Sequence, residues 1–98
     1  MVSITNYKME DGTNVNMTLN FGLLYKLRAE SRDTYNALNK VLVNGQKDIL
    51  ETIDLLYGAY RAANLKNFMS RKEFEENMNQ DFAYNNQILS RLTTGRKK

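Results

Sequence analysis

The side chains in this sequence that could do chemistry are carboxylates, lysines, tyrosines and serines, and one group of carboxylates is closely spaced. Glu73, Glu75 and Glu76 lie close enough along the chain to act as a general acid and base, or to hold a divalent cation through their oxygens. Acidic residues are also favoured in the first turn of a helix, which carries a partial positive charge. Because no softer or basic ligand stands ready to complete a site, we interpret these carboxylates as part of a helix start.

Two residue types that most active sites use are missing from the sequence. It contains no cysteine and no histidine, which excludes disulfides, structural zinc sites and nucleophile systems of the Ser-His-Asp or Cys-His kind. The five glycines are scattered and form neither a GxGxxG pattern nor a P-loop. We therefore expect no catalytic residues, no metal and no cofactor, and the sequence favours a protein that binds another macromolecule.

The excess of positive charge is concentrated at the end of the chain. The 14 Lys and Arg residues exceed the 11 Asp and Glu residues, which gives a net charge of +3. Four of those bases are Arg91, Arg96, Lys97 and Lys98, so residues 1–90 carry ten bases against eleven acids. This tail could contact phosphates, or it could simply be the favourable cationic end of a helix. No helix-turn-helix pattern accompanies it, so the sequence does not favour nucleic acid as the partner.

The first twenty residues have the alternation of a β-hairpin. Residues 10–14 read Glu-Asp-Gly-Thr-Asn, a turn cluster that contains the Asp-Gly pair. Val15, Met17 and Leu19 then alternate with polar residues, while Val2, Ile4 and Met9 supply apolar positions before the turn. We predict a hairpin over residues 1–19.

From Asn20 the apolar period becomes helical. Asn20 is a predicted N-cap, Ser31 or Asp33 can cap a second helix, and Asn44-Gly45 is a predicted stop for that helix. The apolar positions of these two helices are Phe21, Leu24, Leu27, Tyr35, Leu38 and Leu42.

The third helix, from Gln46 to about Asn64, is the clearest amphipathic segment. We predict one buried stripe and one polar face, with Gly58 in the middle of the polar face. The stripe is Ile49, Ile53, Leu56, Tyr60 and Ala63, and the polar face includes Lys47, Glu51, Asp54 and Arg61.

The strongest local signal begins the last helical region. Ser70 and Glu73 have the spacing of a capping box, and Met69 and Phe74 have that of a hydrophobic staple. Asp81 could cap a further helix, so residues 71–93 form either one helix or two. The sequence thus predicts a mainly α, single-domain protein over residues 1–98. Its parts are a hairpin over 1–19, a four- or five-helix array over 20–93 and a frayed basic tail over 94–98.

Several residues at helix ends or stripe edges could contact a partner without being needed in the core. We name Phe21, Tyr25, Tyr57 and Phe68, because aromatic side chains dominate binding hot spots. Gly58 could let a partner helix approach closely. The simpler alternatives, a core-edge role for Tyr57 and a tolerated surface position for Gly58, stay open at this point.

Three segments in this order resemble a known family. They are residues 20–27 (NFGLLYKL), 55–64 (LLYGAYRAAN) and 69–74 (MSRKEF). The order is similar to that of the tail assembly chaperones of long, non-contractile-tailed phages and prophages of Gram-positive bacteria, in which N-F-x-x-L-x-x-L, Y-x-A-x and S-x-E-E-F segments recur.

The resemblance implies a specific role. Such proteins bind the long helical tape measure protein, keep it soluble and help tail tube subunits assemble around it. They act in the host cytoplasm and leave the finished virion, they often exist in a second, frameshifted form, and they have no catalytic or metal residues. Homo-oligomers are possible, and no membrane contact is expected. Two alternatives remain: a small nucleic-acid-binding or regulatory protein that uses the basic tail, and a structural head–tail connector component.

Overall fold

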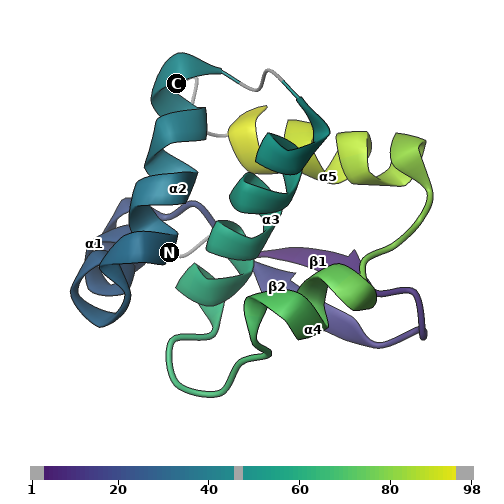
Figure 1. Ribbon diagram of the computed structural model, residues 1–98, viewed down its shortest axis with the longest axis horizontal. Helices are drawn as coiled ribbons and strands as arrows, with labels where there is room; N and C mark the ends of the chain where they lie inside the picture. The colour runs from purple at the N-terminus through teal and green to yellow at the C-terminus, as the bar shows by residue number, and fades with distance from the viewer. Residues whose placement is uncertain (1–3, 46–47, 95–98) are drawn as a thin grey trace.

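The computed structural model describes residues 4–45 and 48–94 of the 98-residue chain. In that part of the chain, a two-stranded antiparallel hairpin precedes five helices, as the sequence predicts (Figure 1). The elements are β1 (Thr5–Lys8), β2 (Asn14–Met17), α1 (Phe21–Glu30), α2 (Arg32–Asn44), α3 (Ile49–Ala63), α4 (Arg71–Glu76) and α5 (Phe82–Thr94).

The hairpin is closed by the predicted turn. Thr5 pairs with Met17, and Lys8 pairs with Asn14. Gly12 has a φ of 92°, a conformation that a side chain would disfavour. The Asp11 carboxylate accepts a hydrogen bond from the Thr13 amide at 2.9 Å, and this contact lowers the pKa of the carboxyl group. Val2, which we placed in the hairpin from its alternation, lies outside the described residues.

The hairpin is fastened to the turn between α4 and α5 through Tyr7. The Tyr7 hydroxyl donates to Asn85 Oδ1 at 2.6 Å and accepts from the Asn79 amide at 3.0 Å. Its ring is fully buried and lies 5.6 Å from the ring of Tyr84. Burial raises the pKa of Tyr7 to about 12, because the phenolate would lose its hydration.

We expect Tyr7→Phe to lower the free energy of unfolding by about 1–3 kcal/mol at neutral pH, since Asn85 Oδ1 and the Asn79 amide lose a buried partner. The folded state holds the Tyr7 proton up to about pH 12, whereas the unfolded chain loses it near pH 10. The wild type should therefore lose stability as the pH rises from 10 to 12. Urea melts between pH 10 and 12 should show that the free energy of unfolding falls less steeply with pH for Tyr7→Phe than for the wild type. The same dependence on pH in both proteins would contradict the role given to Tyr7.

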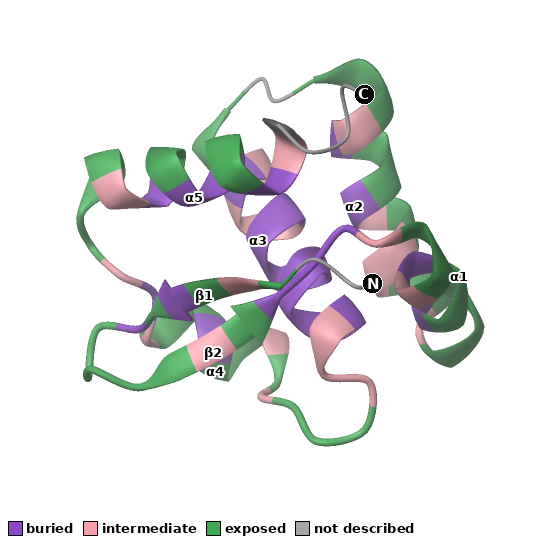
Figure 2. Cartoon of the chain, turned by 180° about the vertical axis from the view of Figure 1, so that it is seen from behind, coloured by how far each residue is buried: buried purple, intermediate pink, exposed green. Residues whose placement is uncertain are grey.

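The centre of the fold is α3. The helices α1 and α2 cover one side of it, and the hairpin, α4 and α5 cover the other (Figures 1 and 2). Every residue from Leu55 to Ala62 is buried, whereas Ile49 at the start of the helix is 60% exposed. The predicted one-sided stripe is therefore wrong for most of this helix, because a helix covered on both sides has no solvent face.

Gly58 is buried where α2 crosses α3. A Cβ atom added to Gly58 would lie 2.7 Å from the Cβ of Leu38, much closer than real side chains pack. The prediction that Gly58 lies on an exposed polar face is thus wrong. Its small size does permit a close helix approach, but the helix that approaches is α2 of the same chain.

We expect Gly58→Ala to lower the free energy of unfolding by roughly 1 kcal/mol. Overpacking costs about 1–3 kcal/mol, and the gain in helix propensity of ~1 kcal/mol offsets part of that cost. The wild type is the reference, because a Cβ at Gly22 would crowd the Asn20 side-chain oxygen that caps α1, at 3.2 Å. Thermal melts in which Gly58→Ala is as stable as the wild type would contradict the close packing of α2 on α3.

The helix ends follow the predicted capping residues. Asn20 accepts from the Leu23 amide, and Ser70 and Glu73 form the predicted capping box. Asp81 accepts from the Tyr84 amide at 3.2 Å, so residues 71–93 contain two helices separated by a turn. A second capping box, Asp48 with Glu51, begins α3. The predicted starting residue of that helix, Gln46, and the residues Gly95–Lys98 of the basic tail lie outside the described part.

Candidate partner-binding groove

The candidate site is a groove between α1 and α2, which are joined through Ser31 alone. Phe21, Leu24, Tyr25 and Arg28 face it from α1, and Tyr35, Asn39 and Leu42 face it from α2. Both sets follow the i, i+4, i+7 spacing of one helix face. Each set therefore covers two helical turns, about 10 Å in length.

The groove has a volume of about 260 Å³. Pockets for small molecules usually span roughly 300–1,000 Å³ and enclose most of the ligand. This hollow is smaller, and its rim is formed by exposed aromatic rings. Its dimensions suit one or two side chains of a protein partner better than a complete metabolite.

The aromatic rim is unusually open. Phe21 is 71% exposed and Tyr25 is 69% exposed, although Leu24 and Leu27 of the same helix are buried. Helix α1 therefore buries these two leucines while its two aromatic side chains stay exposed at the groove. A contiguous exposed apolar surface of this kind commonly marks an interaction site.

The charge of the groove comes from Arg28. Its guanidinium carbon lies 5.3 Å from the centre of the Tyr25 ring and 5.9 Å from that of Tyr35. Cations near the face of an aromatic ring are attracted to its electrons. Within residues 4–45 and 48–94, no ion pair joins Arg28 to a carboxylate.

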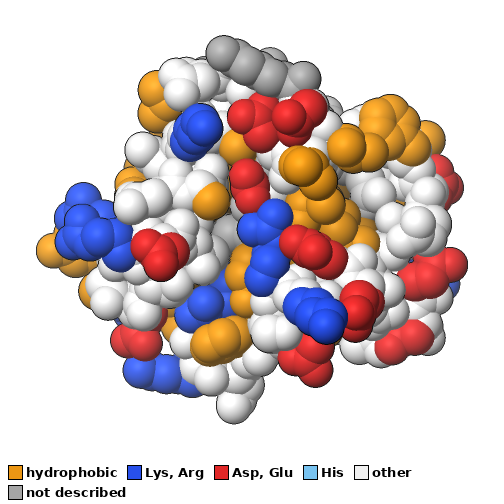
Figure 3. Space-filling model, viewed as in Figure 1, with side chains coloured by type: hydrophobic (Ala, Val, Ile, Leu, Met, Phe, Trp, Pro, Cys, Tyr) orange, Lys and Arg blue, Asp and Glu red, His pale blue; other side chains and the backbone are white. Residues whose placement is uncertain are grey.

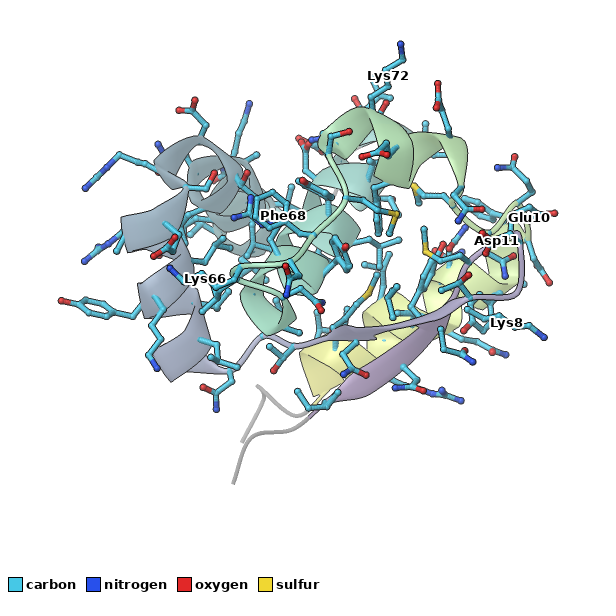
Figure 4. The ribbon with its side chains drawn as sticks, turned by 90° about the horizontal axis from the view of Figure 1, so that it is seen from below. Lys8, Glu10, Asp11, Lys66, Phe68 and Lys72 are labelled. Carbon is cyan, nitrogen blue, oxygen red and sulfur yellow. The ribbon has the colours of Figure 1, made fainter. Side chains whose placement is uncertain are left out.

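The remaining predicted contact residues are separated by the fold. Phe68 lies in the loop after α3, is 45% exposed, and has the Arg61 guanidinium 3.5 Å from its ring centre. The same loop carries Lys66, which Figure 4 labels together with Phe68. Lys66 pairs with Glu30 at the end of α1, with 3.2 Å between Nζ and Oε2. Phe68 is thus exposed, as predicted, but it does not line the groove.

The prediction that Tyr57 lies at the protein surface is wrong. Tyr57 is 5% exposed, and its hydroxyl donates to the Met69 carbonyl at 2.8 Å. Its ring meets Phe74 edge-on with 5.3 Å between the centres. Burial raises the pKa of Tyr57, partly offset by the neighbouring Arg61. The core-edge alternative describes Tyr57 correctly, and Tyr60 is buried as expected.

Two of the three carboxylates considered for catalysis, Glu73 and Glu75, have structural partners. Glu73 belongs to the capping box, and Glu75 Oε2 lies 2.6 Å from Nε of Arg71, which also pairs with Asp54 at 2.9 Å. Among the described residues no three acidic side chains are placed so that they could hold a metal ion. On the face shown in Figure 3, acidic and basic side chains are interleaved and hydrophobic ones form separate groups. That face carries no large field of one sign.

Comparison with protein families, curated proteins and solved structures finds no match to this chain. The described helices also include none with the length and apolar character that crossing a membrane requires.

Of the seven residues that line the groove, the sequence indicated only Phe21 and Tyr25 as contact residues. The other five are Leu24, Arg28, Tyr35, Asn39 and Leu42. The i, i+4, i+7 spacing of Tyr35, Asn39 and Leu42 places them on one helix face. It indicates a groove only once α2 is known to lie beside α1. A second exposed apolar set, Val43, Ile49 and Leu50, was also missed.

Proposed function

We propose that this protein is a binding protein whose α1–α2 groove holds an amphipathic helix of a partner, and that it acts as a tail assembly chaperone for the tape measure protein. The observation that carries the proposal is the pair of exposed aromatic residues, Phe21 and Tyr25, over a groove of the folded chain. Aromatic anchors at such a surface supply most of the energy in helix-in-groove recognition. The resemblance of residues 20–27, 55–64 and 69–74 to tail assembly chaperones adds the identity of the partner.

The groove suits the task physically. A tape measure protein outside its tail tube exposes long apolar helical stripes, which would associate with one another in water. A groove two turns long covers apolar residues at positions i, i+3, i+4 and i+7 of such a stripe. Contact over two turns is short, so the complex can dissociate when tube subunits take over the same stripe.

Co-expression tests this proposal. The tape measure protein of the same genome should move from the insoluble to the soluble fraction when this chain is produced with it, and the two should co-purify at moderate salt. An unrelated helical protein of similar size is the control for general effects on expression. If the tape measure protein stays insoluble and unbound, the chaperone function is wrong.

A further inference from the structure

We infer that Arg28 pairs with a carboxylate of the bound helix, so that the α1–α2 groove selects amphipathic helices with Glu or Asp beside their apolar stripe. The inference rests on the proposed function only in taking the groove as a docking surface. The inference adds the charge that the partner helix must carry and names Arg28 as the residue that binds this charge.

The position of Arg28 is the first argument. Arg28 is the last of the α1 residues that line the groove, one to two turns beyond Phe21 and Tyr25. The Tyr25 and Tyr35 rings lie 5.3 Å and 5.9 Å from its guanidinium carbon. A guanidinium held by aromatic faces has fewer conformations to lose and presents a fixed fork of donors, which matches the two oxygens of a carboxylate.

The surrounding charges are the second argument. The nearest acidic residue along α1, Glu30, is bound by Lys66 of the α3–α4 loop. Helices α1 and α2 together carry four bases, Lys26, Arg28, Arg32 and Lys40, against two acids, Glu30 and Asp33. The rest of the described chain has the opposite balance, six bases against nine acids. The groove thus lies on the positive part of a protein body that is otherwise acidic, and an acidic segment is the complementary occupant.

The geometry defines the ligand further. Phe21 and Arg28 are seven residues apart, which corresponds to about 10 Å along α1. A helix lying along the groove would therefore place its acidic side chain about two turns from the apolar side chain that contacts Phe21. Charge at this position contributes more to specificity and to the association rate than to total affinity.

Three synthetic helical peptides test the inference. They share one leucine stripe and differ at a single flanking position, which carries Glu, Gln or Lys. By fluorescence anisotropy at low salt, the wild type should bind the Glu peptide about 5-fold more tightly than the Gln peptide, with a further loss for Lys. Arg28→Gln should abolish the preference, Arg28→Glu should reverse it, and added salt should reduce it.

Lys26→Gln is the matched control, because Lys26 is an exposed cation on the same helix that does not line the groove. Lys26→Gln should keep the preference for the Glu peptide.

Equal affinity of the wild type for all three peptides would overturn the role of Arg28 while leaving the groove as a docking surface. A preference that disappears with Lys26→Gln and survives Arg28→Gln would overturn it as well. If no peptide binds, both the inference and the docking surface are wrong, whereas a preserved preference with no binding of the tape measure protein would refute only the chaperone function.

Discussion

Replacement of Tyr57 by alanine is expected to lower the free energy of unfolding by about 3–5 kcal/mol, the usual cost of removing a large buried aromatic side chain. The centre of the Tyr57 ring lies 5.9 Å from that of Tyr60 and 5.3 Å from that of Phe74. Its hydroxyl also holds the carbonyl of Met69, the residue before the Ser70 cap of α4. The substitution therefore opens a cavity between α3 and α4 and releases the entry to α4. Urea denaturation followed by circular dichroism measures the loss.

Two variants separate the parts of this effect. Tyr57→Phe keeps the ring and removes only the hydrogen bond to Met69, so it should cost about 1 kcal/mol. Tyr25→Ala removes a tyrosine that is 69% exposed, and its stability should stay within about 0.5 kcal/mol of the wild type. A Tyr57→Ala protein as stable as Tyr25→Ala would show that Tyr57 is not a core residue.

The double replacement of Phe21 and Tyr25 by alanine should weaken partner binding and leave the stability of the protein nearly unchanged. Each anchor that is buried by a partner costs about 2 kcal/mol or more on truncation. Binding of the tape measure protein should therefore weaken by ~30-fold for one anchor and by up to ~1,000-fold for both. The melting temperature should change little, because both side chains are mostly exposed in the free protein. Quantitative pull-down of the tape measure protein, together with a thermal melt of each variant, measures both effects.

Phe82→Ala is the control for general loss of exposed aromatic surface. Phe82 is 59% exposed at the start of α5 and does not line the groove. Its removal should leave binding unchanged. Equal binding by the wild type and the Phe21/Tyr25 double variant would locate the interface elsewhere, and unfolding of the double variant would show that these rings support the core.

Local signals predicted the fold well because the residues that set helix ends and turns act on their immediate neighbours. Asn20, Ser70 and Asp81 each accept a hydrogen bond from an amide three residues on, and this requirement is visible in the sequence. The Asp-Gly turn of the hairpin is equally local. None of these features depends on which helices pack together.

The environment of α3 could not be predicted in the same way. Periodicity places Gly58 and Arg61 on a polar face, yet both are buried, because α2 covers Gly58 and the Phe68 ring covers the Arg61 guanidinium. Only the tertiary arrangement makes these positions interior. The groove was predictable only in part for the same reason: α1 alone indicates Phe21 and Tyr25, whereas Tyr35 joins them only when α2 lies alongside.

The most direct test of the proposed binding surface is a backbone NMR titration of the isotope-labelled protein with helical segments of the tape measure protein. We expect amide shift changes to concentrate on residues 21–28 and 35–42, with little change along β1, β2 and α4. Changes centred instead on Val43, Ile49 and Leu50, or no changes at saturating peptide, would contradict the assignment of the groove as the partner-binding site.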